Sequence, residues 1–322
     1  MNTVPGFIDL HVWGEPAALS RLLPRSGTTA FCSALGPQPV EALQQAVARV
    51  PRRGELAGAR WLGWHLEGPF LNPRRGGALP RRWMRAPRRS ELEALWRASR
   101  QAIRLITLAP ELPGALDAIR WCRRRGIAVS LGHTEAGALA ARRAIAAGAR
   151  AVTHVFNGMP PLHHRRPGLL DVALASRELV TMAIADGVHV SPAALRLLVQ
   201  LKGASRVALV TDSIRHAHPS ARPSASLGTS PRGVAGLRWP VVKRHGAFYL
   251  RDGTLAGSDL TMIHAVRMMV ERVGVPLRDA VRMASAVPAR LLGAPRTADR
   301  VTFDERFRVL RTIVAGRAVY ER

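Results

Sequence analysis

The amino-acid sequence predicts an α/β fold built around a parallel β-sheet. Short apolar runs that end in polar residues recur along the chain, and segments with helical periodicity separate them. Eight such units occupy about 250 residues, the usual size of a TIM (β/α)8 barrel. A chain of 322 residues therefore suits one barrel with a small appendage better than two equal domains.

The eight predicted strands lie at 7–11, 28–34, 61–67, 103–109, 127–133, 151–156, 180–186 and 207–212. Helical segments are predicted at 39–50, 89–100, 115–125, 135–147 and 192–201. The run from Ala151 ends at Asn157-Gly158, which places His154 at the carboxyl end of a strand, with a basic loop behind it. In a barrel, that end carries the catalytic groups.

The remainder of the chain predicts a loop, further helices and a small sheet. A Pro/Ser/Arg-rich stretch at 216–232 is typical of an active-site or disordered loop. Two strand-like pieces around Trp239 and Phe248, a turn at Asp252-Gly253 and helices at 260–273 and 277–286 follow. Alternation over 300–319 predicts small antiparallel strands. We divide the chain into a barrel, 1–293, and a C-terminal β appendage, 294–322.

The charge is strongly positive, since 48 basic and 22 acidic residues give +26. Only Lys202 and Lys243 are lysines, which leaves 46 arginines, scattered over predicted helices and loops. A coding bias that favours arginine over lysine explains this scatter, and a polyanion partner is the alternative. Nucleic-acid binding would favour a clustered basic stripe, whereas an anionic small substrate agrees with a positive field.

Cysteine content and hydropathy indicate a protein of a reducing compartment. Cys32 and Cys122 lie in apolar segments and give no disulfide framework. We see no apolar run long enough for a bilayer and no secretory signal after Met1. We therefore expect a cytoplasmic protein with no membrane partner.

Polar groups end five of the predicted strands: His11, Glu67, His133, His154 and Asp212. A carboxylate and two imidazoles that converge on a barrel mouth can hold a divalent cation such as zinc and leave one position open for water. Each histidine alone is explained as a hydrogen-bonded loop residue. Together at strand ends, they favour a metal site.

Nine motifs follow one another along the chain. They are PGFIDLH at 5–11, HLEGPFLNP at 65–73, TLAPE at 107–111, LGHTEA at 131–136, THVFNGMPPLHHRRPG at 153–168, ADGVHVSP at 185–192, LVTD at 209–212, LAGSDLTM at 255–262 and PARLLG at 288–293. In this order, they resemble the motifs of the N-acetylglucosamine-6-phosphate deacetylases of the amidohydrolase superfamily. The resemblance covers nearly the whole chain. It implies a hydrolase that acts on a linear amide carbon–nitrogen bond.

The resemblance also implies roles for individual residues. It assigns one divalent metal, zinc or alternatively iron, to Glu67, His133 and His154, and the role of catalytic acid and base to Asp212. Its substrate-binding positions are Asn157, Gly158, Arg165, His189, Ala78 and Leu79. Arg165 matches a phosphate-binding arginine that, in the family, reaches across a dimer interface. A homodimer is therefore expected.

Several polar residues near these motifs are given no catalytic role. Asp186 is interpreted as a strand-end turn residue and Glu135 as a charge in the first turn of a helix. Two interpretations remain open for His163, His164 and Arg166: a part in the site, or a solvated loop with no role there.

The position of Trp13 bears on the number of metals. Trp13 stands two residues after His11, where binuclear amidohydrolases have a second histidine. We therefore expect one metal, with His11 nearby and not assigned as a ligand.

The sequence departs from the family pattern in three ways that bear on the substrate. At the barrel mouth, Val287 stands before Pro288 where asparagine is usual, and Trp13-Gly14-Glu15-Pro16 replaces a glycine-rich loop. The family segment Lys-Gly-Ala-His corresponds to Gly76-Gly77-Ala78-Leu79, so an apolar side chain replaces a polar contact. The barrel also begins near Met1, whereas family members carry an N-terminal segment of a small β-sandwich. That appendage is expected to be reduced.

The function predicted from these observations is metal-dependent removal of an acetyl or similar acyl group from an amino sugar that bears a phosphate, such as N-acetylglucosamine 6-phosphate or a close analogue. One alternative is a deacylase of a specialised pathway that acts on a different N-acyl amino sugar or sugar nucleotide. An alternative of another class is a non-catalytic, basic, nucleic-acid-associated protein. The presence of Glu67, His133, His154 and Asp212 together argues against this last alternative.

Overall fold

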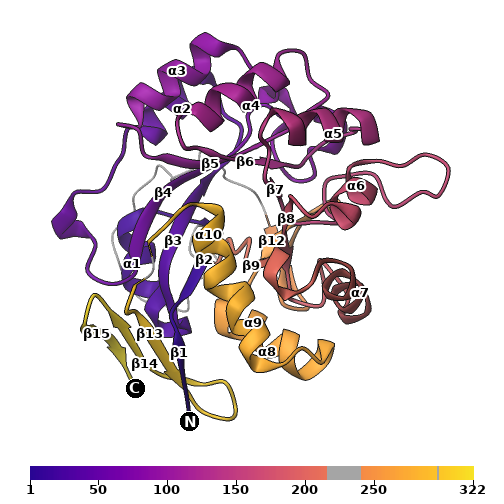
Figure 1. The fold of residues 1–322 in the computed structure, drawn as a ribbon. Coiled ribbons are helices and arrows are strands. Elements are labelled where there is room, and N and C mark those ends of the chain that lie inside the picture. Colours follow the sequence, from indigo (N-terminus) through magenta and orange to yellow (C-terminus); the bar gives the residue numbers. More distant parts are fainter. Residues whose placement is uncertain (216–240, 296) are drawn as a thin grey trace.

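The computed structural model describes residues 1–215, 241–295 and 297–322, and its centre is an eight-stranded parallel sheet (Figure 1). The strands follow one another in chain order. They are β2 (Phe7–Trp13), β3 (Thr28–Leu35), β4 (Arg60–Glu67), β5 (Ile103–Leu108), β6 (Ala128–Leu131), β7 (Ala151–Val152), β8 (Val180–Ile184) and β9 (Val207–Val210). All eight predicted strands are confirmed, although β6 and β7 end before the histidines that follow them.

The first and last strands of this sheet meet and bring the sheet close to a closed barrel. The Asp212 amide donates to the carbonyl oxygen of His11 at 2.8 Å, and the Trp13 amide donates to that of Ser213 at 3.0 Å. Val12 and Ser213 form a parallel bridge. The predicted TIM barrel is confirmed, and the residues after β9 lie directly beside the end of β2.

Helices surround the sheet on its outer side (Figure 1). They are α1 (Pro16–Leu22), α2 (Val40–Val47), α3 (Arg89–Ala98), α4 (Ala115–Arg124), α5 (Ala138–Ala147), α6 (Leu169–Ala175), α7 (Pro192–Lys202), α8 (Met262–Met268), α9 (Leu277–Ala284) and α10 (Ala286–Leu291). A π-helical turn, Met269–Val273, extends α8, and 3-10 turns lie at Leu23–Ser26, Arg53–Glu55, Pro73–Arg75, Arg81–Trp83 and Ala204–Arg206.

The sequence shows why such helices begin and pack where they do. α7 starts after Ser191, whose side chain accepts a hydrogen bond from the Ala194 amide, and proline occupies the first helical position. α4 buries Ala118, Ile119 and Cys122, which recur at the spacing of one helix face. Each helix therefore covers the barrel with one apolar face.

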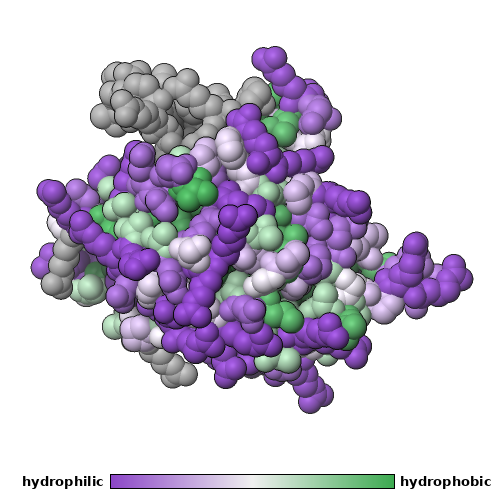
Figure 2. All heavy atoms as spheres, turned by 90° about the horizontal axis from the view of Figure 1, so that it is seen from above, coloured by the Kyte–Doolittle hydropathy of each residue, from purple (hydrophilic) through white to green (hydrophobic). Residues whose placement is uncertain are grey.

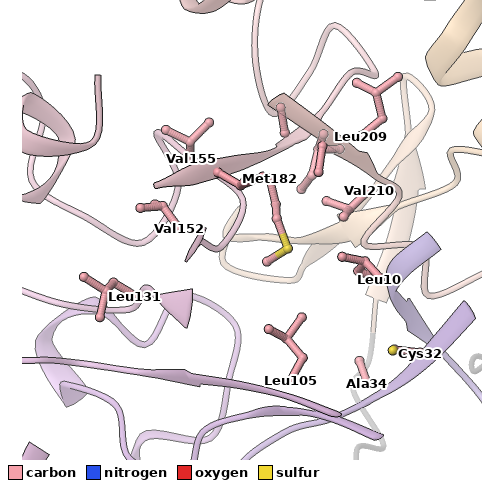
Figure 3. Close-up of a cluster of buried hydrophobic side chains, with 14 of the residues drawn as sticks. Leu10, Cys32, Ala34, Leu105, Leu131, Val152, Val155, Met182, Leu209 and Val210 are labelled. Atoms are coloured by element: carbon pink, nitrogen blue, oxygen red, sulfur yellow. The ribbon is translucent and has the colours of Figure 1, made fainter. Parts of the chain in front are cut away.

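The hydrophobic core fills the inside of the barrel and the space between the barrel and the helices around it. Figure 3 shows buried side chains from β2, β3, β5, β6, β8 and β9, among them Leu10, Cys32, Leu105, Leu131 and Met182. Burying each large apolar side chain contributes about 1.5–3 kcal/mol. This core holds the strand ends in fixed relative positions, which a site built from several strands requires.

Two small antiparallel sheets accompany the barrel. One has the order β1 (Asn2–Pro5), β13 (Arg300–Phe303), β14 (Val309–Val314) and β15 (Arg317–Glu321), and both chain ends lie near it (Figure 1). The predicted C-terminal strands are confirmed. The pairing of Thr3 with Thr302 shows, however, that residues assigned to the barrel segment 1–293 also contribute to this sheet. The division at residue 293 stays a prediction.

The second small sheet contains β10 (Val241–Arg244), β11 (Ala247–Leu250) and β12 (Leu255–Ser258). Ser258 bridges to Ser213, directly after Asp212, so this sheet reaches the carboxyl end of the barrel. The strand expected near Phe248 is β11. The loop predicted at 216–232 and the strand-like piece around Trp239 lie outside the described residues.

The surface is largely polar. Figure 2 shows one face on which hydrophilic residues predominate and hydrophobic residues form small, separate groups. Within the described residues, none of the helices combines the length and the apolar character that crossing a membrane requires. Cys32 and Cys122 are both buried and free.

Candidate active site

Three buried side chains meet at the carboxyl end of the barrel. Glu67 is the last residue of β4, and His133 and His154 each lie two residues beyond the end of β6 and β7. Oε1 of Glu67 lies 3.0 Å from Nε2 of His133 and 2.8 Å from Nε2 of His154. The two Nε2 atoms are 3.1 Å apart. The structure thus brings the three predicted metal ligands together as a triangle of oxygen and nitrogen atoms.

The hydrogen bonding of His133 shows what this triangle is suited to hold. Its Nδ1 lies 2.7 Å from the carbonyl oxygen of Arg75, which can only accept, so Nδ1 carries the proton. When the ring is neutral, Nε2 directs a lone pair at the Glu67 carboxylate; when the ring is protonated, Nε2 donates to that carboxylate. Acceptor atoms this close repel one another unless a proton or a cation lies among them. Two imidazoles and a carboxylate, one of them held by a backbone carbonyl, fit a divalent cation.

The ionisation of these groups supports the same view. Burial alone would raise the pKa of Glu67, but the charge of His11 and hydrogen bonds from His133 and His154 hold that pKa well below its ordinary value. Burial alone would lower the pKa of His133, yet its hydrogen bond to Glu67 and the charge of Glu67 hold it above its ordinary value. Glu67 is therefore an anion that attracts positive charge into a buried space.

The backbone is strained at the same positions. His133, His154 and Asp212 have φ values of +48°, +28° and +49°, in the left-handed region that side chains other than glycine rarely occupy. Each residue follows a strand end and turns out of the sheet, which explains why β6 and β7 are short. Such strain is typical of functional sites, where the surrounding structure holds the residue in place.

Asp212 lies on the opposite side of the same opening, two residues beyond β9. Its Oδ1 accepts a hydrogen bond from Nε1 of Trp13 at 2.8 Å and lies 3.0 Å from Nε2 of His11. Burial would raise its pKa, but the charge and hydrogen bond of His11 hold that pKa below its ordinary value. Asp212 is therefore ionised at neutral pH, as the acceptor of a water proton must be.

His11 is fully buried between two carboxylates. Its Nε2 lies 3.0 Å from Asp212 and 3.6 Å from Oε2 of Glu67. Burial would lower the pKa of His11, but Glu67 and Asp212 raise it to about 9. The ligand atoms of His11, Glu67 and His154 also lie within 4.8 Å of one another. His11 is thus close to the ligand triangle, where the sequence placed it.

Behind His11, a chain of polar side chains crosses the barrel interior. Nδ1 of His11 lies 2.7 Å from Nδ1 of His65, whose Nε2 lies 2.8 Å from the hydroxyl of Thr107. That hydroxyl pairs with Thr153 at 2.7 Å, and Thr153 pairs with Ser130 at 2.6 Å. Burial and the charge of His11 hold the pKa of His65 well below its ordinary value, so His65 is neutral.

A cavity of about 260 Å³ opens above these groups. Its lining includes nine of the ten predicted site residues: Glu67, Ala78, Leu79, His133, His154, Asn157, Gly158, His189 and Asp212. Leu79 is 6% exposed, so its apolar side chain forms part of the wall. The predicted ligands, the predicted proton carrier and the predicted substrate contacts therefore share one cavity.

The remaining predicted site residue, Arg165, is not among the described residues that line this cavity. It lies exposed on the loop between β7 and α6. His163 of the same loop accepts hydrogen bonds from the amides of Arg165 and Arg166 and stacks on His164. These local contacts agree with the interpretation of His163, His164 and Arg166 as a solvated loop.

Asp186 orients His189. Oδ2 of Asp186 lies 2.6 Å from Nδ1 of His189, and its Oδ1 accepts the amides of Val188 and His189 at 2.8 Å each. Asp186 is therefore a turn residue, as predicted. Its side chain also fixes the imidazole of His189, which lines the cavity. Since Nδ1 faces the carboxylate, Nε2 is the nitrogen of His189 that remains for a ligand.

Glu111 ties the loop after β4 to the loop after β6. It accepts hydrogen bonds from Asn72 Nδ2 at 2.8 Å and from the Glu135 amide at 2.7 Å, and Thr134 donates to its other oxygen. Glu135 forms an ion pair with Arg75, whose carbonyl holds His133. Glu135 thus stabilises the ligand loop from outside the cavity.

Sequence reasoning missed some residues of the site. The loop and strand at Thr254–Gly257 line the cavity, and Trp13 contacts Asp212. His65 shares a face of β4 with Glu67, a signal that strand alternation could have provided. The position of Trp13 two residues after His11 indicates that it lies near the metal site. No local pattern indicates its hydrogen bond to Asp212 or the place of Thr254 in the cavity, because both depend on contacts between distant segments.

The chain is similar to known proteins along most of its length. The amidohydrolase family model matches residues 3–319. An N-acetylglucosamine-6-phosphate deacetylase of Bacillus subtilis (strain 168) is 36% identical over 308 residues, which cover 90% of this chain and 75% of that protein. An N-acetylgalactosamine-6-phosphate deacetylase of Escherichia coli O157:H7 is also 36% identical, over 90% of this chain and 78% of that protein.

A solved structure shows the same likeness in three dimensions. The N-acetyl-D-glucosamine-6-phosphate deacetylase of Mycobacterium smegmatis, a mutant in complex with N-acetyl-D-glucosamine-6-phosphate, superposes with a TM-score of 0.83 at 32% identity. The match covers 98% of this chain and 86% of that one. The chain therefore belongs to the amidohydrolase family, in the group of the N-acetylglucosamine-6-phosphate deacetylases.

Proposed function

We propose that this protein hydrolyses the N-acetyl group of a phosphorylated amino sugar, such as N-acetylglucosamine 6-phosphate or a close analogue. The observation that carries the proposal is the triangle of Glu67, His133 and His154 with the ionised Asp212 across the same cavity. The relatives named as deacetylases of two epimeric amino-sugar phosphates support the substrate class.

In this proposal Glu67, His133 and His154 hold one divalent cation, and zinc is preferred over iron because the donor set of two imidazoles and a carboxylate suits it. A bound cation supplies Lewis acidity to the amide carbonyl and lowers the pKa of a water molecule beside it. Glu67 contributes the negative charge, and Arg75 fixes the tautomer of His133 through its carbonyl oxygen.

Asp212 is the proton carrier in the proposed reaction. Its carboxylate is ionised, 15% exposed and faces the cavity, so it can accept the proton of the attacking water. The same group then returns the proton to the departing amine nitrogen as the carbon–nitrogen bond breaks. His189, fixed by Asp186, is placed to bind and orient the sugar through Nε2.

We also propose a homodimer in which Arg165 of one copy contacts the phosphate in the cavity of the other. Arg165 is exposed on its loop, and Leu162 and Leu139, 57% and 64% exposed, lie on that loop and on α5. A guanidinium matches the paired oxygens of a phosphate.

Arg165→Ala should raise KM for a phosphorylated substrate far more than for the same sugar without phosphate, and light scattering should give a dimer mass. An equal effect on both sugars, or a monomer mass with phosphate selectivity intact, contradicts this arrangement.

Leu79 favours a second candidate within the same chemistry, a deacylase whose substrate differs near this residue. A buried leucine cannot exchange a hydrogen bond with a polar substrate group. A panel of N-acetyl and longer N-acyl amino sugars, with and without a 6-phosphate, separates the candidates by the rate at which each substrate releases free amine. Absence of amide hydrolysis across the panel with metal-loaded protein would refute both.

A further inference from the structure

Trp13 makes an unusual contact for an aromatic residue at the end of a barrel strand. It is the last residue of β2, it is 3% exposed, and it lines the cavity. Its indole Nε1 donates to Oδ1 of Asp212 at 2.8 Å, across 199 residues of sequence. The residue therefore reaches the proposed proton carrier directly and contacts the reaction space with a nitrogen that can only donate.

A second group of nitrogen and oxygen atoms lies beside this contact. Nε2 of His11 is 3.0 Å from Oδ1 of Asp212 and 3.6 Å from Oε2 of Glu67. Glu67 thus directs Oε1 at the triangle with His133 and His154, and Oε2 at His11. When Nε2 of His11 carries no proton, an imidazole and two carboxylates at these separations form a potential cation site.

The indole nitrogen changes the chemistry of this second group. It has no lone pair to give to a cation, and its hydrogen occupies Oδ1 of Asp212, the atom that such a site would need. An aromatic ring also fills the adjoining space. Trp13 therefore contributes a hydrogen-bond donor where a cation site would need a further ligand, and the second group cannot bind a cation.

We propose that Trp13 is a positioning residue that holds Oδ1 of Asp212, closes the second group to a cation, and leaves Oδ2 of Asp212 to exchange the proton. The catalytic part of this inference rests on the proposed function, whereas the closure of the second group concerns metal content alone. The contacts from Trp13 and His11 both fall on Oδ1 of Asp212, so the two oxygens of this carboxylate have distinct tasks.

Trp13→Phe tests the positioning role, because it keeps the aromatic bulk and removes the donor. We expect kcat to fall by about 10-fold or more, since the lost bond is to a charged group, while KM and zinc content change by less than about twofold. Trp64→Phe is the matched control. Trp64 is also buried, and its Nε1 donates to the carbonyl oxygen of Val47 at 2.9 Å, so this variant should keep the parental kcat.

Trp13→His tests the closure of the second group, because it replaces the donor with a ring that can offer a lone pair. Apoprotein titrated with zinc and equilibrated by dialysis should bind one equivalent in the parent and in Trp13→Phe, and two in Trp13→His. With Mn²⁺, electron paramagnetic resonance should show coupled ions in that variant alone. If Trp13→His does not fold, Trp13→Asn replaces it, since its amide oxygen is also a potential ligand.

Either measurement can overturn the inference. Two equivalents of zinc in the parent, one equivalent in the folded histidine or asparagine variant, or a parental kcat in Trp13→Phe each contradicts it. Failure of the proposed function gives a different result: the parent would hydrolyse none of the N-acyl amino sugars. The zinc counts would then still decide whether Trp13 closes the second group.

Discussion

Oε1 of Glu67 lies 2.8 Å from Nε2 of His154, although 87 residues separate the two in sequence. β4 and β7 are not neighbours in the sheet, so this contact spans the mouth of the barrel. A carboxylate and an imidazole at this distance, both almost fully buried, bind a proton or a cation between them.

Glu67→Gln should abolish tight zinc binding. The amide keeps the size of the side chain but removes the charge that compensates a buried cation, and purified parent protein should contain about one equivalent. Elemental analysis after dialysis measures both. Glu91→Gln is the control, because Glu91 of α3 is a largely buried carboxylate that pairs with Arg85 away from the cavity. Retained zinc in Glu67→Gln, or two equivalents in the parent, would show that the ligand set is wrong.

Asp212→Asn should keep the metal and the fold while kcat falls by ~10²-fold or more, the usual range for loss of a general acid and base. An amide cannot accept the proton of water at neutral pH. Single-turnover release of amine, together with metal analysis, measures the effect. Asp299→Asn, which alters a carboxylate paired with Arg60 near the small sheet, should retain the parental kcat. Turnover at the parental rate in Asp212→Asn would exclude Asp212 as the proton carrier.

Leu79→His should increase activity on N-acetylglucosamine 6-phosphate. Leu79 leaves a polar group of that substrate unpaired, which costs about 1–3 kcal/mol, so the parent should be poor on it and better on a substrate with an apolar or absent group there. The ratio of kcat/KM between two such substrates measures the shift. A parent that already reaches ~10⁴ M⁻¹s⁻¹ or more on the common substrate, with no gain in the variant, contradicts the prediction.

Lys202→Met should destabilise the fold by about 1–3 kcal/mol at pH 7, because it leaves buried carbonyl groups unpaired. Nζ of Lys202 donates to the carbonyl oxygen of Ala173 at 2.7 Å and also to that of Ser176, at the end of α6. Urea unfolding measures the change. Lys243→Met is the control: Lys243 is exposed and pairs with Asp259, so the variant should lose about 1 kcal/mol or less.

The same residue should give a pH dependence. Burial lowers the pKa of Lys202 from its ordinary value of 10.5 to about 8. Between these two values the unfolded chain holds the proton and the folded chain does not, so the stability of the parent should rise relative to Lys202→Met as the pH increases from 8 to 10.5. Urea unfolding of both proteins over this range measures the difference. A constant difference, or one that shrinks, would show that the folded-state pKa is not lowered.

Local patterns in the sequence were enough to predict the architecture and the main chemical groups. Alternation of apolar runs and helical segments predicted all eight strands of the barrel, because burial on both faces makes such strands continuously apolar. Residues at strand ends, together with the resemblance, indicated Glu67, His133, His154 and Asp212, which the structure brings to one cavity. These assignments depend on local patterns, since strand direction alone fixes which residues reach the barrel mouth.

The pairs of atoms through which these residues meet could not be predicted from the sequence, because they depend on the three-dimensional fold. The hydrogen bond from Trp13 to Asp212, the path from His11 through His65 to Thr107, and the orientation of His189 by Asp186 depend on side-chain rotamers and on backbone turns beyond the strands. β1 likewise joins the C-terminal strands through a pairing of residues about 300 positions apart. Such contacts leave no periodic signal, because their geometry arises only when the closed barrel sets the distances between its strand ends.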